Sequence, residues 1–369
     1  MEWLLLASGV VLAFANGAND NIKGVATIYG SGQLGYGRAL TLATASQIAG
    51  SLASVVLATA LVKAFSGKGL VPPELLTPEL LTAVALGAAL TVGVATRVGL
   101  PISTTHAIVG GLVGAGAVVA GSALDLGALG AAFVLPLAVG PIVAVLLAWA
   151  FNRAGDSIGS RLGRERGVCV CVCVEPARPL ASEPGAGVAY AGVEAGIQLK
   201  IARASECTAH GTVELAGIEI DRALRVGHIA SATTVGFARG LNDTPKILGL
   251  MVGAAVIDPT AGAGVLGIAM ALGGLLASRR VADTLALGIT PMRNGQGLAA
   301  NLATSLLVVG ASRLGLPVST THVSTGGIFG IGVAARTLQH RQVGEILGAW
   351  LGTLPVAAAL GALFAWGLA

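Results

Sequence analysis

Two short sequences each occur twice in this chain and decide its fold: FANGAND at residues 14–20 returns as FARGLND at 237–243, and GLPISTTH at 99–106 returns as GLPVSTTH at 315–322. Around each motif, matching residues recur at a constant separation along the chain, and all four copies place polar residues inside long apolar stretches. Polar residues are costly in a membrane interior and are kept there for a function. A duplicated, interrupted hydrophobic segment is typical of secondary transporters built from two repeats, with the binding site at the repeat interface.

The composition predicts a membrane protein. Of 369 residues, 54% are hydrophobic and 11% are charged, and the mean hydropathy is +0.83. Such a chain is too apolar for a surface that faces water. The 55 glycines and the low aromatic content of 4% suit helices that pack closely through small residues. We therefore predict an all-α polytopic protein of the lipid bilayer, and its net charge of +4 needs no nucleic acid partner.

Hydropathy divides the chain into three parts. Hydropathy predicts five membrane segments in each half, in the same order. The segments that carry the polar motifs are expected to be broken or re-entrant helices. Irregular backbone of this kind is tolerated in a membrane only where protein or a water-filled cavity satisfies its polar groups. The segments are 3–30, 39–62, 80–98, 101–121 and 125–151, then 228–257, 260–278, 284–312, 317–335 and 343–368. The predicted breaks in 3–30 and 228–257 are Asn16 to Lys23 and Arg239 to Lys246. The predicted domains are a first membrane repeat at 1–151, an insert at 152–226 and a second membrane repeat at 227–369.

The insert differs from both halves. Its run VCVCVCV at 168–174 alternates with a period of two, which is typical of a half-buried strand and predicts a small β-containing insert. Arginines flank it at both membrane ends, which favours a cytoplasmic location. All four cysteines lie in the insert. Disulfides are disfavoured there, because a reducing compartment keeps thiols free. The thiols are expected to pack in the core of the insert, and binding of a soft metal is the alternative. If each half crosses the membrane an odd number of times, the repeats are inverted and the N-terminus lies outside.

The first motif predicts a cation site. Asp20 and Asp243 each follow an asparagine, with a glycine two residues before that asparagine. Freed backbone carbonyls, an amide oxygen and a carboxylate are hard ligands that suit Na⁺. The plainer alternative is a local salt bridge of each aspartate with the lysine three residues later. The expected cation-binding residues, with sodium in the region of the two aspartates, are Asn19, Asp20, Asn242 and Asp243.

The second motif predicts an anion site. Proline is well tolerated at the first position of a helix, and hydroxyl residues cap its free N–H groups. A helix that begins inside the membrane turns those groups and its positive dipole end towards a ligand. Two such helix starts would give a tetrahedral oxyanion two sets of donors, and the plainer alternative is N-capping alone. The expected anion-binding residues are Ser103, Thr104, Thr105, Ser319, Thr320 and Thr321.

These motifs carry a resemblance to a known family. The chain resembles the inorganic phosphate transporter (PiT) family, whose members have a Gly-Ala-Asn-Asp segment and a Gly-Leu-Pro-[Ile/Val]-Ser-[Thr/Gly]-Thr-His segment in each half. The match covers both membrane halves. The resemblance implies an inverted-repeat transporter, commonly a dimer, that moves inorganic phosphate with Na⁺ or H⁺. It also implies cation sites near the Asn-Asp pairs and phosphate near the Ser-Thr-Thr residues.

The chain departs from the family pattern near the expected site. Members often carry glutamates where this chain has Gln47 and Asn301, which is expected to alter the number or type of coupling ions. Lys23 replaces a small residue and would offset Asp20 or assist a divalent anion. The two copies of the first motif also differ, with Asn16 in one against Arg239 in the other. The residues expected to support the site are Lys23, Gln47, His106, Lys246, Asn301 and His322.

The leading expectation is a cation-coupled phosphate importer of the cell (inner) membrane that works by alternating access, forms a homodimer and needs no cofactor. A bound cation would lower the cost of placing an anion beside two carboxylates. A transporter of another tetrahedral oxyanion such as sulfate is the alternative within this class. Other classes are an intramembrane aspartyl protease, which gives no role to the Ser-Thr-Thr-His motifs, and a sensor that binds the anion without moving it. The expected protein is not an enzyme.

Overall fold

A computed structural model describes residues 1–67, 69–125, 127, 130–161, 168–174, 197–203, 213–253 and 256–368. The chain divides into two compact units. The first unit joins Met1–Arg153 with His228–Ala369, and the second is Ala154–Gly227. Both membrane halves therefore fold together into the first unit, which carries both copies of each motif.

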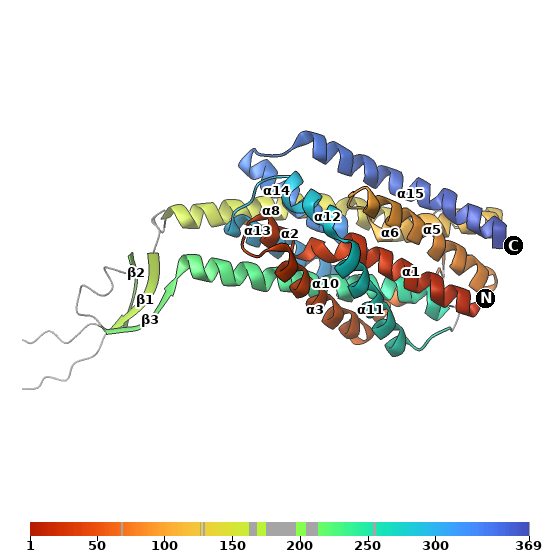
Figure 1. Ribbon diagram of the computed structural model, residues 1–369, viewed down its shortest axis with the longest axis horizontal. Helices are drawn as coiled ribbons and strands as arrows, with labels where there is room; N and C mark the ends of the chain where they lie inside the picture. Colours follow the sequence, from red (N-terminus) through yellow and green to blue (C-terminus); the bar gives the residue numbers. More distant parts are fainter. Residues whose placement is uncertain are drawn as a thin grey trace, which may run out of the picture. The chain divides into compact units, whose positions relative to one another are not determined.

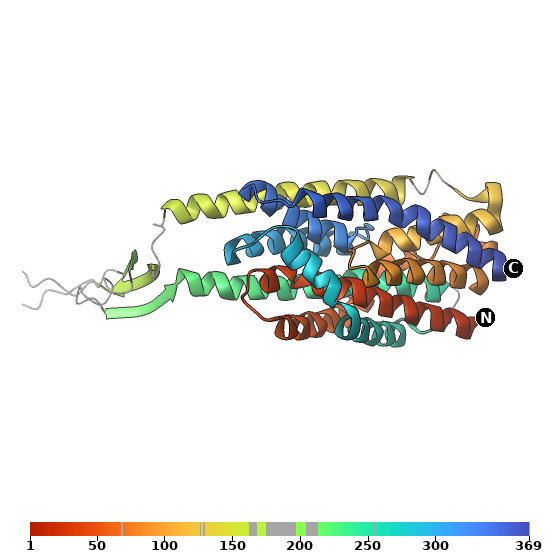
Figure 2. The same cartoon turned by 45° about the horizontal axis from the view of Figure 1, so that its top comes forward.

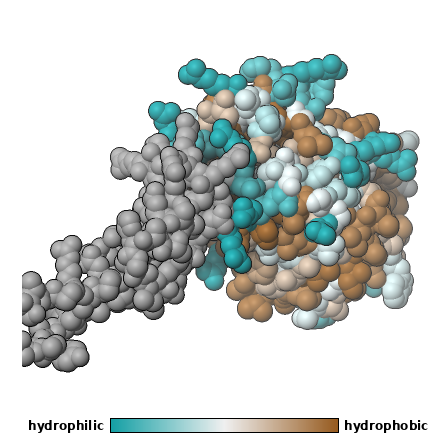
Figure 3. All heavy atoms as spheres, turned by 60° about the vertical axis from the view of Figure 1, so that its left-hand side comes forward, coloured by the Kyte–Doolittle hydropathy of each residue, from teal (hydrophilic) through white to brown (hydrophobic). Residues whose placement is uncertain are grey.

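The first unit is helical (Figure 1). Six of the described helices are long and apolar enough to cross a membrane, and apolar side chains cover much of the visible face of this unit (Figure 3). The chain is therefore a multi-pass membrane protein. The helices before the insert are α1 (Glu2–Asp20), α2 (Ala26–Gly30), α3 (Tyr36–Leu57), α4 (Thr59–Ala64), α5 (Pro78–Arg97), α6 (Thr104–Ala120) and α8 (Leu135–Arg161). Those after it are α10 (Ile220–Gly253), α11 (Pro259–Ala277), α12 (Arg279–Asp283), α13 (Asn294–Arg313), α14 (Thr320–Ala335) and α15 (His340–Leu368).

The motif segments follow the prediction in three of four places. Helix α1 ends at Asp20 and is followed by a 3₁₀ turn over Asn21–Gly24, and both Ser-Thr-Thr-His segments open a helix after an irregular stretch. The predicted break between Arg239 and Lys246 is wrong, because α10 continues through it and includes Pro245. A proline inside a membrane helix removes one hydrogen bond without ending the helix where neighbours satisfy the freed carbonyl.

One further predicted segment is divided. Residues 284–312 were expected to form one span, but α12 passes into a π-helical turn over Thr284–Gly288, and α13 begins only at Asn294. Pro291 lies in the gap between them, where it disfavours helix at the residue before it. The single span that was predicted from the hydropathy of this stretch is therefore wrong.

The two helices that carry the first motif run in opposite directions. In Figures 1 and 2, α1 runs from the right-hand side towards the left, while α10 runs from left to right. Opposite directions of equivalent helices are the arrangement that inverted repeats produce. This geometry brings the polar end of α1 and the polar middle of α10 into the same part of the unit.

Each motif helix packs against a helix of the opposite repeat. A Cβ atom added at Gly50 of α3 would collide with the carbonyl oxygen of Phe237 on α10, and one added at Gly273 of α11 would collide with that of Phe14 on α1. The two glycines occupy equivalent positions of the two repeats, as do the two phenylalanines. Only glycine allows backbones to approach this closely. The duplicated glycines therefore fix a crossed contact between the repeats on both sides.

The second unit contains a small sheet. Its strands are β1 (Val168–Val174), β2 (Ile197–Arg203) and β3 (Val213–Glu219), in the order β2-β1-β3. Both pairings are antiparallel, with Val168 opposite Arg203 and Val174 opposite Val213. The alternating Val-Cys run is the central strand β1. Cys207 and His210, which with the three cysteines of this run make up the candidate soft-metal site of the insert, lie outside the described residues.

Candidate functional site

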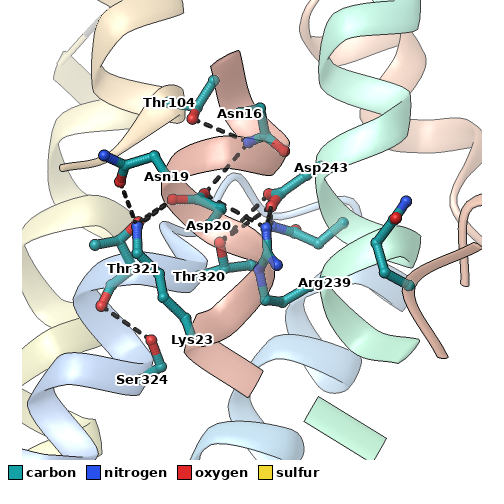
Figure 4. A network of polar contacts seen from close by, with 12 residues as sticks. Asn16, Asn19, Asp20, Lys23, Thr104, Arg239, Asp243, Thr320, Thr321 and Ser324 are labelled. Atoms are coloured by element: carbon teal, nitrogen blue, oxygen red, sulfur yellow. Dashed lines mark hydrogen bonds and ion pairs between the residues drawn. The ribbon is translucent and has the colours of Figure 1, made fainter. Parts of the chain in front are cut away.

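Residues of both repeats form one buried polar network within the helical unit (Figure 4). The end of α1 and the turn after it supply one set of residues, the middle of α10 supplies a second, and the starts of α6 and α14 supply hydroxyls. All members are at most 5% exposed. Those from the motifs are Asn16, Asn19, Asp20, Lys23, Thr104, Thr105, Arg239, Asn242, Asp243, Lys246, Thr320 and Thr321.

Asp20 is held by groups from both repeats. Its Oδ1 pairs with the ammonium of Lys23, and Asn16 Nδ2 donates to its Oδ2 over 3.3 Å. From the other repeat, the Thr321 hydroxyl donates to Oδ1 over 3.3 Å, and Arg239 Nη2 lies 3.7 Å from Oδ2. A buried carboxylate needs such partners, because its desolvation costs several kcal/mol (about 3 or more).

Asp243 has an equivalent environment. Lys246 Nζ lies 3.3 Å from its Oδ1, and Arg239 Nη2 lies 3.2 Å from its Oδ2. Asn242 Nδ2 donates to Oδ1 over 3.2 Å, and the Thr320 hydroxyl donates to Oδ2 over 3.3 Å. The local salt bridge considered as the plainer alternative therefore exists at both aspartates.

The lysine of each repeat contacts a threonine of the opposite repeat. Lys23 Nζ donates over 2.6 Å to the hydroxyl of Thr321, which lies in the second repeat. Lys246 Nζ donates over 2.8 Å to the hydroxyl of Thr105, which lies in the first. Thr105 and Thr321 occupy the same position in the two copies of the motif. The two motifs are therefore coupled across the repeat interface as well as within each repeat.

Backbone carbonyls before the two helix starts bind the same lysines. Lys23 Nζ donates to the carbonyl of Ile102 over 3.1 Å, and Lys246 Nζ donates to that of Val318 over 2.6 Å. The proline and glycine before these residues keep the segment out of a helix, which leaves both carbonyls free to accept. Irregular backbone within the membrane part is thus satisfied by charged side chains.

The serines and the threonines of the motif have different roles. Ser103 and Ser319 cap α6 and α14, since each Oγ accepts from the backbone N–H three residues later over 3.1 Å. N-capping, the plainer alternative for this motif, therefore describes the serines. Thr104 instead accepts from Asn16 Nδ2 over 2.9 Å. The threonines, rather than the serines, join the charged network.

In each repeat, the asparagine of the Asn-Asp pair is hydrogen-bonded to the helix that precedes the Ser-Thr-Thr-His segment, which is α5 in the first repeat and α13 in the second. Asn19 Nδ2 donates to Thr96 Oγ1 over 2.9 Å, and Ser312 Oγ donates to Asn242 Oδ1 over 3.2 Å. Asn19 Oδ1 accepts from Lys23 Nζ over 2.9 Å. Both amide oxygens that were expected to face a cation thus already accept hydrogen bonds. Thr96 and Ser312 were missed in the sequence, although they too occupy equivalent positions of the two repeats.

Two of the expected supporting residues, Gln47 and Asn301, lie outside the charged network. Gln47 Nε2 donates to Ser51 Oγ over 2.7 Å, and Thr244, the neighbour of Asp243, donates to the same oxygen over 2.7 Å. Asn301 Oδ1 accepts from the Thr27 hydroxyl over 3.1 Å. These amides contact neutral hydroxyls.

The two motif histidines stack on each other. The ring centroids of His106 and His322 are 4.5 Å apart, and the His322 ring lies 3.9 Å from that of Trp350. Trp350 Nε1 donates to the carbonyl of Pro101 over 3.0 Å. This aromatic stack packs the starts of α6 and α14 against α15, so the histidines support the helix starts.

Arg239 is the main site residue that the sequence prediction omitted. It is 2% exposed, and it bridges the two aspartates. The sequence did contain an indication of its role, because a residue four positions before an aspartate lies on the same face of a helix as that aspartate. Arg239 was missed because the helix was expected to break at this position, whereas α10 continues through it.

The charge of the network favours an anion. Three basic side chains and two carboxylates belong to it among the described residues, which gives a formal charge of +1. Two helix N-termini add their positive dipole ends. Arg239 Nε and Nη1 are buried and have no hydrogen-bond partner in the described part of the chain. Such unpaired donors are suited to the oxygens of an oxyanion.

A membrane-embedded site shared by two duplicated halves defines the class: the protein is a membrane transporter, not an enzyme. The chain belongs to the phosphate transporter family, whose model matches residues 16–361. It is 27% identical to the "Probable low-affinity inorganic phosphate transporter" of Mycobacterium bovis, over 99% of this chain and 76% of that one. It is 28% identical to "Inorganic phosphate transporter 2-1, chloroplastic" of Arabidopsis thaliana, over 99% and 72%.

A solved structure shares the fold. The protein titled "The sodium-dependent phosphate transporter" matches with a TM-score of 0.75 and 21% sequence identity, covering 100% of this chain and 98% of that one. The likeness extends over the whole length of both chains. The fold of a phosphate transporter therefore holds here although four residues in five differ.

Proposed function

We propose that the protein imports inorganic phosphate by secondary active transport coupled to a cation, Na⁺ or H⁺. The observation that carries the proposal is the network in which threonines of each repeat contact the lysine of the other, within a chain of the phosphate transporter family. Phosphate would bind among these threonines, the lysines and Arg239. In that position, the positive groups offset the cost of removing the anion from water.

The contacts between the two repeats support the proposal of alternating access. The hydrogen bonds of Thr321 with Lys23 and of Thr105 with Lys246 join residues of opposite repeats. Movement of one repeat against the other would therefore change the binding site itself. Binding that favours one arrangement of these contacts over another would shift the balance between outward and inward states.

Phosphate is preferred to sulfate because the network also contains acceptors. Phosphate at neutral pH carries a proton that it can donate, and sulfate does not. The carboxylates of Asp20 and Asp243 lie beside the threonines that are proposed to bind the anion. Uptake of labelled phosphate into proteoliposomes, with Na⁺ and pH gradients imposed separately, tests both the transport and its coupling.

Competition distinguishes the two oxyanions. Unlabelled arsenate, which has the same protonation chemistry as phosphate, is expected to compete with labelled phosphate, and sulfate is not. Strong competition by sulfate with none by arsenate would overturn the phosphate assignment. Mutation of Asp243 that abolished peptide cleavage but left uptake intact would instead favour a protease.

The proposed setting is the cell (inner) membrane, with the insert in the cytoplasm, the N-terminus outside and two copies in a dimer. All four cysteines of the chain lie in the insert. A membrane-impermeant maleimide is therefore expected to label the chain in inverted vesicles or permeabilised cells and not in intact cells. Light scattering of the purified protein in detergent measures the number of copies.

A further inference from the structure

The residues that the two repeats supply to the charged network are of the same type at every equivalent position except one. Asn16 and Arg239 are equivalent residues of the two copies, and each reaches the carboxylate four residues later, over 3.3 and 3.2 Å. Arg239 alone also reaches across the interface, to 3.7 Å from Asp20. The second repeat thus supplies one cation that the first repeat lacks.

Every carboxylate oxygen of the network already has a basic partner. The Oδ1 atoms of Asp20 and Asp243 face Lys23 and Lys246, and both Oδ2 atoms face Nη2 of Arg239. A sodium ion shared by the two aspartates would take the position of this guanidinium. Arginine is always protonated in proteins, so its charge is a fixed part of the site.

The count of charges shows what Arg239 changes. Without it, two lysines and two aspartates cancel, and a bound monoanion would need an added cation. With it, the network has a formal charge of +1, which a monoanion neutralises. The neighbouring amides Gln47 and Asn301 add no negative charge that a second cation would have to balance.

The unpaired N–H groups of Arg239 also indicate that the ligand is an anion. Its Nε and Nη1 are buried and have no acceptor among the residues that the structure describes, whereas its Nη2 is shared by the two aspartates. One edge of the guanidinium therefore serves the carboxylates, and the remaining N–H groups are left for an oxyanion.

We propose that Arg239 is a built-in counter-cation that replaces a coupling sodium ion, so that phosphate binding and uptake by this protein are independent of Na⁺. The inference rests on the proposed function and narrows its coupling cation to the proton. Carrying the monoanion H₂PO₄⁻ is equivalent to carrying HPO₄²⁻ together with one proton, so the loaded site is neutral without a metal ion and each cycle moves one net negative charge.

The test is uptake of labelled phosphate by the full chain in liposomes, with external Na⁺ replaced by choline. Wild-type uptake is expected to be equal in the two media, and ²²Na⁺ is not expected to enter with phosphate. Arg239→Asn, which copies the equivalent residue Asn16, is expected to become dependent on Na⁺, with about tenfold stimulation, a size usual for coupling between two ligands. Arg239→Lys keeps the charge and is expected to remain independent of Na⁺.

Arg313→Asn is the matched control, because Arg313 is an exposed arginine at the end of α13. It is expected to behave as the wild type does. Wild-type uptake that requires Na⁺, or ²²Na⁺ that enters with phosphate, would overturn the inference and leave phosphate transport standing. If Arg239→Asn does not fold, the ²²Na⁺ measurement on the wild type decides alone.

Failure of the proposed function looks different. If no labelled phosphate enters under any imposed Na⁺ or pH gradient, the transport proposal fails. Calorimetry of inorganic phosphate binding in Na⁺-free detergent then tests Arg239 by itself. Binding by the wild type that is lost in Arg239→Asn supports the counter-cation, and wild-type binding that appears only with Na⁺ overturns it.

Discussion

Thr320 and Thr321 are neighbours in sequence, yet they serve different repeats. Thr320 donates to Asp243 of its own repeat, and Thr321 contacts Asp20 and Lys23 of the other. Successive residues of a helix point about 100° apart, so one helix start can face both halves of the site. This divergence makes the two hydroxyls separable by mutation.

Replacement of Thr321 by valine keeps the shape and removes the hydroxyl. We expect the KM for phosphate to rise about tenfold to a hundredfold, because a hydrogen bond to a charged group contributes about 1.5–3 kcal/mol. Thr325→Val is the control, since Thr325 is fully buried on the same helix and its hydroxyl has no partner among the described residues. Equal KM values for the two variants would contradict the role of Thr321.

Asp243 balances two basic side chains. Asp243→Asn leaves Arg239 and Lys246 without that charge, which costs about 3–5 kcal/mol for a broken buried pair. We expect uptake to be lost and the Tm of the purified protein to fall by about 5–10 °C. Adding Lys246→Met to this variant is expected to recover part of the Tm and none of the uptake. A wild-type Tm in the single variant would refute the charge balance.

At the scale of elements, glycine sets how closely helices of opposite repeats can cross. Gly50 and Gly273 lie against the backbone of α10 and α1, and the same relation is repeated by Gly240 against Gln47 and Gly17 against Met270. Helices in lipid gain little from the hydrophobic effect between them, so their association depends on such close packing. The crossings hold the motif helices at the distance that the charged network needs.

Alanine at either crossing is expected to separate the helices. Gly50→Ala and Gly273→Ala should each destabilise the fold by about 1–3 kcal/mol, because the new methyl group meets a backbone carbonyl that cannot move freely. Gly264→Ala on α11 meets nothing within 4 Å and should leave the protein as stable or slightly more so. Thermal unfolding followed by size-exclusion chromatography measures this, and equal Tm values for all three variants would refute the crossing.

At the scale of the whole molecule, both copies of each motif belong to the same compact unit. The residues of the network all lie within Met1–Arg153 and His228–Ala369. The three-stranded sheet belongs to the second unit, Ala154–Gly227. Among the residues that the structure describes, the charged network therefore contains none from the insert.

Replacement of residues 162–219 by a flexible Gly-Ser linker is expected to keep phosphate uptake, because no network residue is removed. The measurement is uptake in proteoliposomes at equal amounts of inserted protein. The same shortened chain with Asp243→Asn serves as the inactive control. Loss of uptake by a shortened chain that is still folded would show that the insert is required for transport.

Much of the site could be predicted from the sequence because the duplication marks it. A residue that recurs at a fixed separation occupies an equivalent place in both halves, and this relation identified the Asn-Asp pairs and the threonines of the Ser-Thr-Thr segments, whose serines instead cap α6 and α14. The same relation applied to Thr96 and Ser312 would have found two further members. Arg239 escaped it because its equivalent, Asn16, is a different residue type.

Hydropathy and motif spacing can be measured along the chain, and they were sufficient to predict a helical membrane protein of two repeats with polar helix starts. Three features could not be predicted in this way: α10 runs unbroken through its motif, each lysine binds the threonine of the opposite repeat, and Arg239 bridges both aspartates. The physical reason is that these features depend on how the two repeats cross. A sequence gives the charge of each side chain, whereas the partner that neutralises it is fixed by packing.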